Sequence, residues 1–127
     1  MENYLIDSNT ISGYFSSLFP DKGMEIVARA INQIPNISVI TKIEALSWIS
    51  NDKKKEGIVR SFVEDSIIIP LSDEIVEACI KLRRNRKIKT PDAIIATTAM
   101  IHNFKLISCD KIFTNIPTLK LINPIDI

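Results

Sequence analysis

The feature that most constrains the fold of this chain is the alternation of short apolar runs with longer stretches of helical pattern. Five runs have the length and composition of strands: residues 3–6 (NYLI), 37–40 (ISVI), 66–70 (SIIIP), 105–108 (KLIS) and 119–122 (LKLI). Most are continuous apolar runs without strict polar alternation, a pattern typical of strands that are buried on both sides. The sequence therefore predicts a parallel sheet covered by helices on both faces, with 66–70 as a buried strand.

Six stretches between these runs have the apolar spacing or the end signals of helices. They are residues 8–19, 22–34, 42–50, 53–65, 73–86 and 91–103. The chain has 127 residues, which suits one domain and is enough to bury a core without disulfides. We find no repeat, linker or low-complexity segment, so we expect a single α/β domain over residues 1–127.

Composition excludes several classes of protein. The two cysteines, Cys79 and Cys109, form no Cys-x-x-Cys pair, so zinc is not expected and reduced thiols in the cytoplasm are. No apolar stretch approaches the roughly 20 residues that span a bilayer, and the N-terminus lacks the pattern of a signal peptide. The net charge is only +1, so nucleic-acid binding would have to depend on a local basic patch.

Four acidic residues lie at element boundaries. Asp7 and Asp110 each follow a predicted strand, Glu44 lies one turn after another, and Asp92 opens the last predicted helix. Ligands of open α/β sheets bind beyond the carboxyl ends of the strands. Several carboxylates in one cleft repel one another and lose solvent, which a divalent cation would relieve. Oxygen ligands favour Mg²⁺ or Mn²⁺ over zinc.

Each of these acids also has a purely structural interpretation. Asp7 could cap the N-terminus of a helix, and Thr41–Glu44 (TKIE) fits a capping box. In Thr90–Asp92 (TPD), the threonine could be an N-cap, the proline the first helical residue, and the aspartate a first-turn acid. Asp110 could be a turn residue. Capping and ligand binding are compatible, because a capped helix end is a rigid place for a ligand.

Four segments in order make the chain resemble the PIN-domain family, and most of all the VapC-type ribonuclease toxins of prokaryotic toxin–antitoxin pairs. They are YLIDSNTI, ISVITKIEALSW, KTPDAIIATTAMIHNFKLISCDKIF and LKLINP. The resemblance runs through nearly the whole chain. It implies a five-stranded parallel sheet flanked by helices and a magnesium-dependent endoribonuclease, in which a metal-bound water attacks a backbone phosphate. It also implies an RNA substrate, a homodimer and a cognate antitoxin.

The resemblance assigns roles to individual residues. The metal-binding and catalytic acids of the family fall on Asp7, Glu44, Asp92 and Asp110. Asn9 and Ser108 match polar residues that would orient ligands or water from a second layer. One position departs from the pattern, because Cys109 stands where relatives often have an arginine, and a substrate contact could be lost there.

A cationic segment, residues 81–89 (KLRRNRKIK), precedes Asp92. Its basic residues are Lys81, Arg83, Arg84, Arg86, Lys87 and Lys89. Basic residues at a helix C-terminus complement its dipole, but their number favours contact with RNA phosphates, with Arg83, Arg84, Arg86, Lys87 and Lys89 as the contacts.

Three other residues or runs have structural interpretations. For Trp48, core or dimer packing is favoured over stacking on a base. Residues 53–55 (KKK) read as a solvated helix start, and His102 as a histidine at a helix end.

Three other readings stay open. DSNT, residues 7–10, is similar to the D-x-D-x-T start of haloacid-dehalogenase-like phosphatases, but Asn9 replaces the second acid. A receiver domain has a similar length but would need paired acids after the first strand and an acid after a central strand, and residues 67–70 (IIIP) end without one. In the third, the acids form a non-catalytic cleft that binds a basic peptide.

Overall fold

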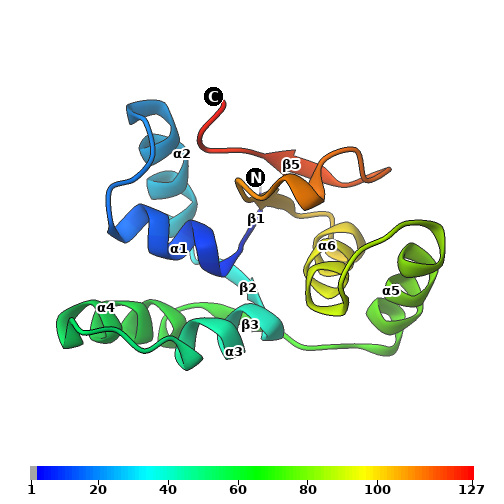
Figure 1. Ribbon diagram of the computed structural model, residues 1–127, viewed down its shortest axis with the longest axis horizontal. Coiled ribbons are helices and arrows are strands. Elements are labelled where there is room, and N and C mark those ends of the chain that lie inside the picture. Colours follow the sequence, from blue (N-terminus) through cyan, green and yellow to red (C-terminus); the bar gives the residue numbers. More distant parts are fainter. Residues whose placement is uncertain (1–2) are drawn as a thin grey trace.

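The computed structural model describes residues 3–127, which form one sheet of five parallel strands with helices on both faces (Figure 1). The strands are β1 (Tyr4–Ile6), β2 (Asn36–Ser38), β3 (Ile67–Ile69), β4 (Lys105–Ile107) and β5 (Lys120–Ile122). Their order across the sheet is β3-β2-β1-β4-β5. The predicted α/β fold is therefore confirmed. The chain first builds outward from β1 to β3 and then returns to the other side of β1, so the switch in strand order lies between β1 and β4.

Helices flank the sheet as two groups. They are α1 (Ser8–Phe15), α2 (Asp21–Asn32), α3 (Val39–Ser47), α4 (Lys53–Glu64), α5 (Asp73–Asn85) and α6 (Thr90–His102), with a short 3-10 helix, η1, at Lys111–Phe113. Figure 1 shows α5 and α6 on one side of the sheet and the other four helices on the opposite side. The shortest connections, such as Asp7 between β1 and α1, place helix starts directly at strand ends.

Neighbouring residues of the central strands face opposite cores, as the period of two in a strand requires. Leu5 lies in the core beneath α5 and α6, whereas Tyr4 and Ile6 lie in the core shared with α1, α2, α3 and α4. Leu106 and Ile107 of β4 divide in the same way. Burial on both faces explains why these strands are continuous apolar runs in the sequence.

Helix α6 is the most buried helix of the structure. Every residue from Ala93 to Ala99 is buried, including Thr97 and Thr98. Their hydroxyl groups donate to backbone carbonyls one turn earlier, at 2.8 Å to Ala93 O and 2.7 Å to Ile94 O, so burying them leaves no donor unsatisfied. Ala93, Ala96 and Ala99 share one buried core with residues of β1 and β4, so α6 packs against the sheet.

Several predicted boundaries differ from the structure, and two of them change the interpretation of a candidate cap. The strand predicted over 37–40 ends at Ser38, because the Ser38 hydroxyl accepts a hydrogen bond from Ile40 N–H at 3.1 Å and begins α3 there. The capping-box interpretation of Thr41–Glu44 is therefore wrong, since Thr41 is already inside the helix. Helix α6 begins one residue earlier than predicted, with Lys89 at the N-cap position and no side-chain cap. Thr90 is thus not the cap.

The strand predicted over 66–70 is only partly buried. It is β3, at the edge of the sheet, where Ile67 is 48% exposed and Ile69 is buried. An edge strand has a neighbour on one side only, and this position could not be read from three consecutive isoleucines.

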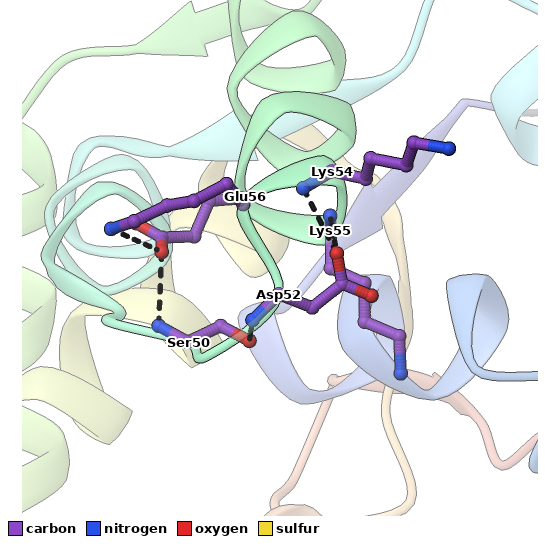
Figure 2. Close-up of polar contacts among 6 residues, drawn as sticks. Ser50, Asp52, Lys54, Lys55 and Glu56 are labelled. Carbon is purple, nitrogen blue, oxygen red and sulfur yellow. Dashed lines mark hydrogen bonds and ion pairs between the residues drawn. The ribbon is translucent and has the colours of Figure 1, made fainter.

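Helix α4 begins with three lysines at the end where the helix dipole disfavours them. Figure 2 shows how neighbouring acids compensate. Asp52 Oδ1 accepts hydrogen bonds from the backbone N–H groups of Lys54 and Lys55, at 3.0 and 3.4 Å. Glu56 Oε2 accepts from Ser50 N–H at 3.1 Å and from the first lysine's ammonium at 3.2 Å. All three lysines are exposed, so the predicted solvated helix start is confirmed.

Candidate metal centre at the switch point

The carboxyl ends of β1 and β4 bring Asp7 and Ser108 together. Ile6 pairs with Ile107 in the sheet, so the next residue of each strand leaves it at the same place. The Ser108 hydroxyl donates to Asp7 Oδ2 at 2.6 Å, and Thr10 N–H donates to Asp7 Oδ1 at 2.9 Å. Asp7 is therefore the N-cap of α1, as predicted, and both of its buried oxygens are held.

Ser108 also connects Asp7 with Asp110. Its hydroxyl oxygen accepts a hydrogen bond from Asp110 N–H at 3.1 Å while its hydrogen goes to Asp7. Asp110 itself is exposed, and its Oδ1 accepts from Ile112 N–H at 3.0 Å, which starts η1. One buried hydroxyl thus sets the position of the first acid and of the backbone that carries the last.

The other two acids come from helices that pack against each other, α3 and α6. Glu44 lies in the middle of α3, and its Oε1 accepts a hydrogen bond from the Ser8 hydroxyl at 3.2 Å. Asp92 is half-buried in the first turn of α6. Both acids therefore lie on helices rather than on loops. The hydrogen bond from Ser8 also ties Glu44 to Asp7, because Ser8 directly follows Asp7 in the chain.

Electrostatic coupling shows that the four acids share one region. Burial raises the pKa of Asp7, and the charge of Asp110 raises it further, against hydrogen bonds from Ser108 and Thr10. Desolvation also raises the pKa of Glu44, with smaller contributions from the charges of Asp92 and Asp7. Desolvation raises the pKa of Asp92, as does the charge of Asp110, against the opposite effect of Lys89. Repulsion between charges thus links each acid to two others. The linked pairs are Asp7 and Glu44, Glu44 and Asp92, Asp92 and Asp110, and Asp110 and Asp7.

We call these four residues the acid ring. Its donors are carboxylate oxygens only, and their mutual repulsion is the situation that a hard divalent cation relieves, so the donor set fits Mg²⁺ or Mn²⁺. Within residues 3–127, however, no three Asp, Glu, His or Cys side chains are arranged as a formed metal site.

The basic segment divides into residues that border the acid ring and residues that do not. Arg83, Lys87 and Lys89 line a cleft of about 570 Å³ together with Asp92 and Asp110. We call it the cationic cleft. Arg83 Nε donates to Ile88 O at 3.1 Å, which holds this turn of the chain against the end of α5.

Arg86 and Arg84 lie elsewhere. The guanidinium of Arg86 donates to Asn115 O at 3.0 Å and Thr114 O at 3.4 Å, so it holds the loop after η1. Arg84 lines a groove along α5 with Leu71 and Ile80. The structure thus brings three of the five predicted RNA-binding residues beside the acids.

Cys109 lies between Ser108 and Asp110 and is half-buried. Burial raises the pKa of its thiol, and the charge of Asp7 raises it further. The thiol is therefore neutral near pH 7 and supplies none of the charge that an arginine would bring here. His102 ends α6, is exposed and stacks on Phe104 with 5.4 Å between ring centroids, which confirms the predicted helix-end histidine.

Sequence reasoning missed a cavity on the other side of Glu44. It has a volume of about 330 Å³ and lies between α1, α3 and α4, with Ser8, Asn9, Glu44 and Trp48 among its lining residues. Trp48 is 40% exposed, so it is not packed in the core, and the alternative of packing in a dimer stays a prediction. Only its four-residue spacing from Glu44 in the sequence could have indicated a shared site.

Comparison with known proteins defines the class to which this fold and site belong. The family model of the PIN domain matches residues 4–119, and the chain belongs to the PIN-domain family. The phosphatase and receiver readings of the sequence are thereby left without support. No curated protein matched the chain.

Solved structures of toxin–antitoxin proteins contain chains with the same fold. A toxin–antitoxin complex from Klebsiella pneumoniae contains a chain that is 31% identical, with a TM-score of 0.76 and with 98% of this chain and 100% of that chain covered. VapBC2 from Rickettsia felis, bound to a DNA fragment from its promoter, matches at 23% identity, TM-score 0.75 and coverage of 94% and 97%. FitAcB from Neisseria gonorrhoeae matches at 20% identity with a TM-score of 0.73, and the match covers 98% of this chain and 99% of that chain. The last two likenesses show the fold alone.

PIN-domain toxins are generally ribonucleases. In the part of the chain that the structure describes, no helix is long and apolar enough to cross a membrane.

Proposed function

We propose that this protein is a magnesium-dependent endoribonuclease and the toxin of a type II toxin–antitoxin pair. The observation that carries the proposal is the acid ring itself: four carboxylates from four separate segments, electrostatically coupled, at the switch point of a PIN-domain sheet. The cationic cleft beside Asp92 and Asp110 supplies the positive charge that a polyanionic substrate needs near such a site.

In this proposal Asp7, Glu44, Asp92 and Asp110 would hold Mg²⁺, or Mn²⁺ in its place. A bound ion would supply an activated water and would neutralise charge on a phosphoryl oxygen. Asp7 is the most rigid of the four, because Ser108 and Thr10 hold both of its oxygens. Glu44 is exposed and has one oxygen without a hydrogen bond to residues 3–127, so it is the acid best placed to take a proton from the attacking water.

The remaining predicted residues have supporting roles. Arg83, Lys87 and Lys89 would hold phosphates next to the scissile bond, while Arg84 and Arg86 would add to the positive field from a greater distance. Ser108 would keep Asp7 oriented, and Asn9, which lies beside Glu44 at the cavity, would orient water or substrate.

The proposal also includes partners. The Klebsiella pneumoniae relative was solved as a toxin–antitoxin complex, which supports a cognate antitoxin for this chain. Exposed Leu71, Val76 and Ile80 line the groove along α5, and we propose that a second copy of the chain covers it in a homodimer. The cytoplasm is the compartment that free, uncrosslinked Cys79 and Cys109 fit.

The direct test is cleavage of total cellular RNA by the purified protein, with Mg²⁺ and with excess EDTA. We expect discrete fragments that require the metal and disappear in Asp92→Asn. Asp73→Asn is the matched control, because Asp73 is also a first-turn acid of a helix on the same face of the sheet but is exposed and outside the acid ring. Equal cleavage by Asp92→Asn and Asp73→Asn would refute the mechanism.

A second candidate is a non-catalytic module whose acidic cleft binds a basic peptide. One observation favours it: Cys109, between Ser108 and Asp110, brings no positive charge to hold an RNA phosphate. Calorimetry separates the two candidates, since Mg²⁺ binding without any RNA cleavage would support the module.

A further inference from the structure

The cavity beside Glu44 has the composition of a site for a flat, polar ligand. Ile11 and Val59 give it an apolar part, Trp48 provides an aromatic surface, and Ser8, Asn9 and Ser12 provide short polar groups. Its volume of about 330 Å³ is at the lower end of the range for small-molecule sites, which begins near ~300 Å³. A site of this size suits one ring system rather than an extended chain.

The polar groups of the cavity are available to a ligand. Ser12 uses its hydroxyl hydrogen on Asn9 O at 3.2 Å and keeps its oxygen as an acceptor. The side-chain amide of Asn9 makes no hydrogen bond with residues 3–127 and is exposed, so it offers both donors and an acceptor. A paired donor and acceptor on one amide match the edge of a nucleobase.

Glu44 belongs both to the acid ring and to this cavity, whereas Asp92 and Asp110 belong to the ring and to the cationic cleft. The acids therefore separate a site for phosphates from a site with an aromatic wall. RNA held by Arg83, Lys87 and Lys89 that crosses the acid ring would meet the cavity next. Charge also favours a base over a phosphate there, because Glu44 repels an anion.

We propose that the cavity binds the base of a nucleotide next to the scissile phosphate, with Trp48 stacking on the ring and Asn9 bonding to its edge. The inference rests on the proposed ribonuclease function and deepens it. A base inside a duplex is stacked and paired, so the substrate must be single-stranded at the cleavage site. Recognition of one base at this position would restrict cleavage to a subset of loops.

Trp48 is the only tryptophan of the chain, so its fluorescence reports directly on the cavity. The test uses the full chain with Asp92→Asn, which keeps RNA intact, and Mg²⁺. Fluorescein-labelled six-nucleotide RNA homopolymers and an abasic phosphodiester of equal length and charge are titrated, with anisotropy reporting binding. Unlabelled oligomers of the same kinds are then used to follow Trp48 emission.

We expect at least one homopolymer to bind and quench Trp48, and the abasic oligomer to bind more weakly without quenching. Trp48→Ala should weaken binding of that homopolymer roughly 5- to 150-fold, the range for loss of one stacked base. Trp48→Phe should restore most of it. Ile49→Ala is the control, since Ile49 is 85% exposed next to Trp48 but does not line the cavity.

The two possible failures are distinct. If the homopolymers bind but leave Trp48 emission unchanged, the base site is refuted while RNA binding stands, and the cavity then serves a protein segment or water. If no oligomer binds at all, both this inference and the proposed function fail.

Discussion

The Ser108 hydroxyl donates to the buried carboxylate of Asp7 at 2.6 Å, across 101 positions of sequence. This bond joins the ends of β1 and β4 at the switch point and leaves Asp7 with both oxygens held. The same hydroxyl accepts from Asp110 N–H, so a single side chain sets the separation of two acids of the ring. The geometry of the proposed metal site therefore depends on a residue that would not itself touch the metal.

Replacing Ser108 tests this dependence. Ser108→Ala should lower the affinity for Mg²⁺ and kcat/KM for RNA cleavage, each by about 10- to 100-fold, as is usual when a partner of a metal ligand is removed. Ser108→Thr keeps the hydroxyl and should retain most of both. Calorimetry and initial cleavage rates give the two numbers. An unchanged Mg²⁺ affinity in Ser108→Ala would mean that Asp7 does not depend on this bond.

Asp7→Asn should raise the free energy of unfolding of the metal-free protein at pH 7.5 while abolishing cleavage. The reason is that burial raises the pKa of Asp7, so its charged form is destabilising in the fold, and the amide removes that charge while its oxygen can still accept from Thr10 N–H. Urea denaturation in EDTA measures the change. Asp21→Asn is a control that should lower the free energy of unfolding slightly, because the charge of exposed Asp21 in the first turn of α2 interacts favourably with the helix dipole.

The stability of the metal-free protein should fall as the pH rises from about 4. The folded-state pKa values of Asp7, Glu44 and Asp92 are raised, so between the unfolded and folded values the folded protein binds more protons than the unfolded chain. The contribution of these three acids to the free energy of unfolding is fully present below their unfolded-state pKa values. It is lost as the pH rises through their folded-state pKa values. Added Mg²⁺ should therefore raise Tm more at pH 7.5 than at pH 5. An equal gain at both values would contradict binding at these acids.

Changing Lys87 and Lys89 together to glutamine should weaken RNA binding and lower the slope of log K against log salt by about 1 to 2, because two phosphate contacts are lost. The matched control changes Lys54 and Lys55, which carry the same charge and are exposed at the start of α4. Fluorescence anisotropy at several salt concentrations measures both. Equal slopes in the two double variants would indicate a diffuse charge effect without a cationic cleft.

The cap of α4 offers a test of stability that leaves the site untouched. Asp52→Ala removes the acceptor for two backbone N–H groups and should cost about 0.5 to 2 kcal/mol of unfolding free energy. Glu64→Ala in the last turn of the same helix should change it by no more than a few tenths, since exposed Glu64 accepts no such bond. Cleavage should be unchanged in both, once any loss of folded protein is allowed for.

Much of the fold was readable from the sequence because local signals agreed with it. Asp7 looks like an N-cap after an apolar run, and it is one. The start of α3 was missed because Val39 and Ile40 have the β-branched character of a strand, while the Ser38 hydroxyl that ends the strand has no distinctive pattern.

The positions of side chains outside the acid ring could not be predicted, for a different reason. Arg83 and Arg86 are three positions apart, yet one lines the cationic cleft and the other holds the loop after η1, because the helix ends between them at Asn85. The exposure of Trp48 likewise depends on how α1 and α4 surround the end of α3, which no local pattern records.

The acid ring is assembled from segments that begin near one end of the chain and finish near the other. Asp7 has its partner only when β4 lies beside β1, and β4 in turn pairs with β5 at residues 120–122. During synthesis, the first acid therefore emerges from the ribosome long before the group that holds it. A nascent chain that has not yet reached residues 105–110 lacks both Ser108 and Asp110, so it cannot complete the acid ring.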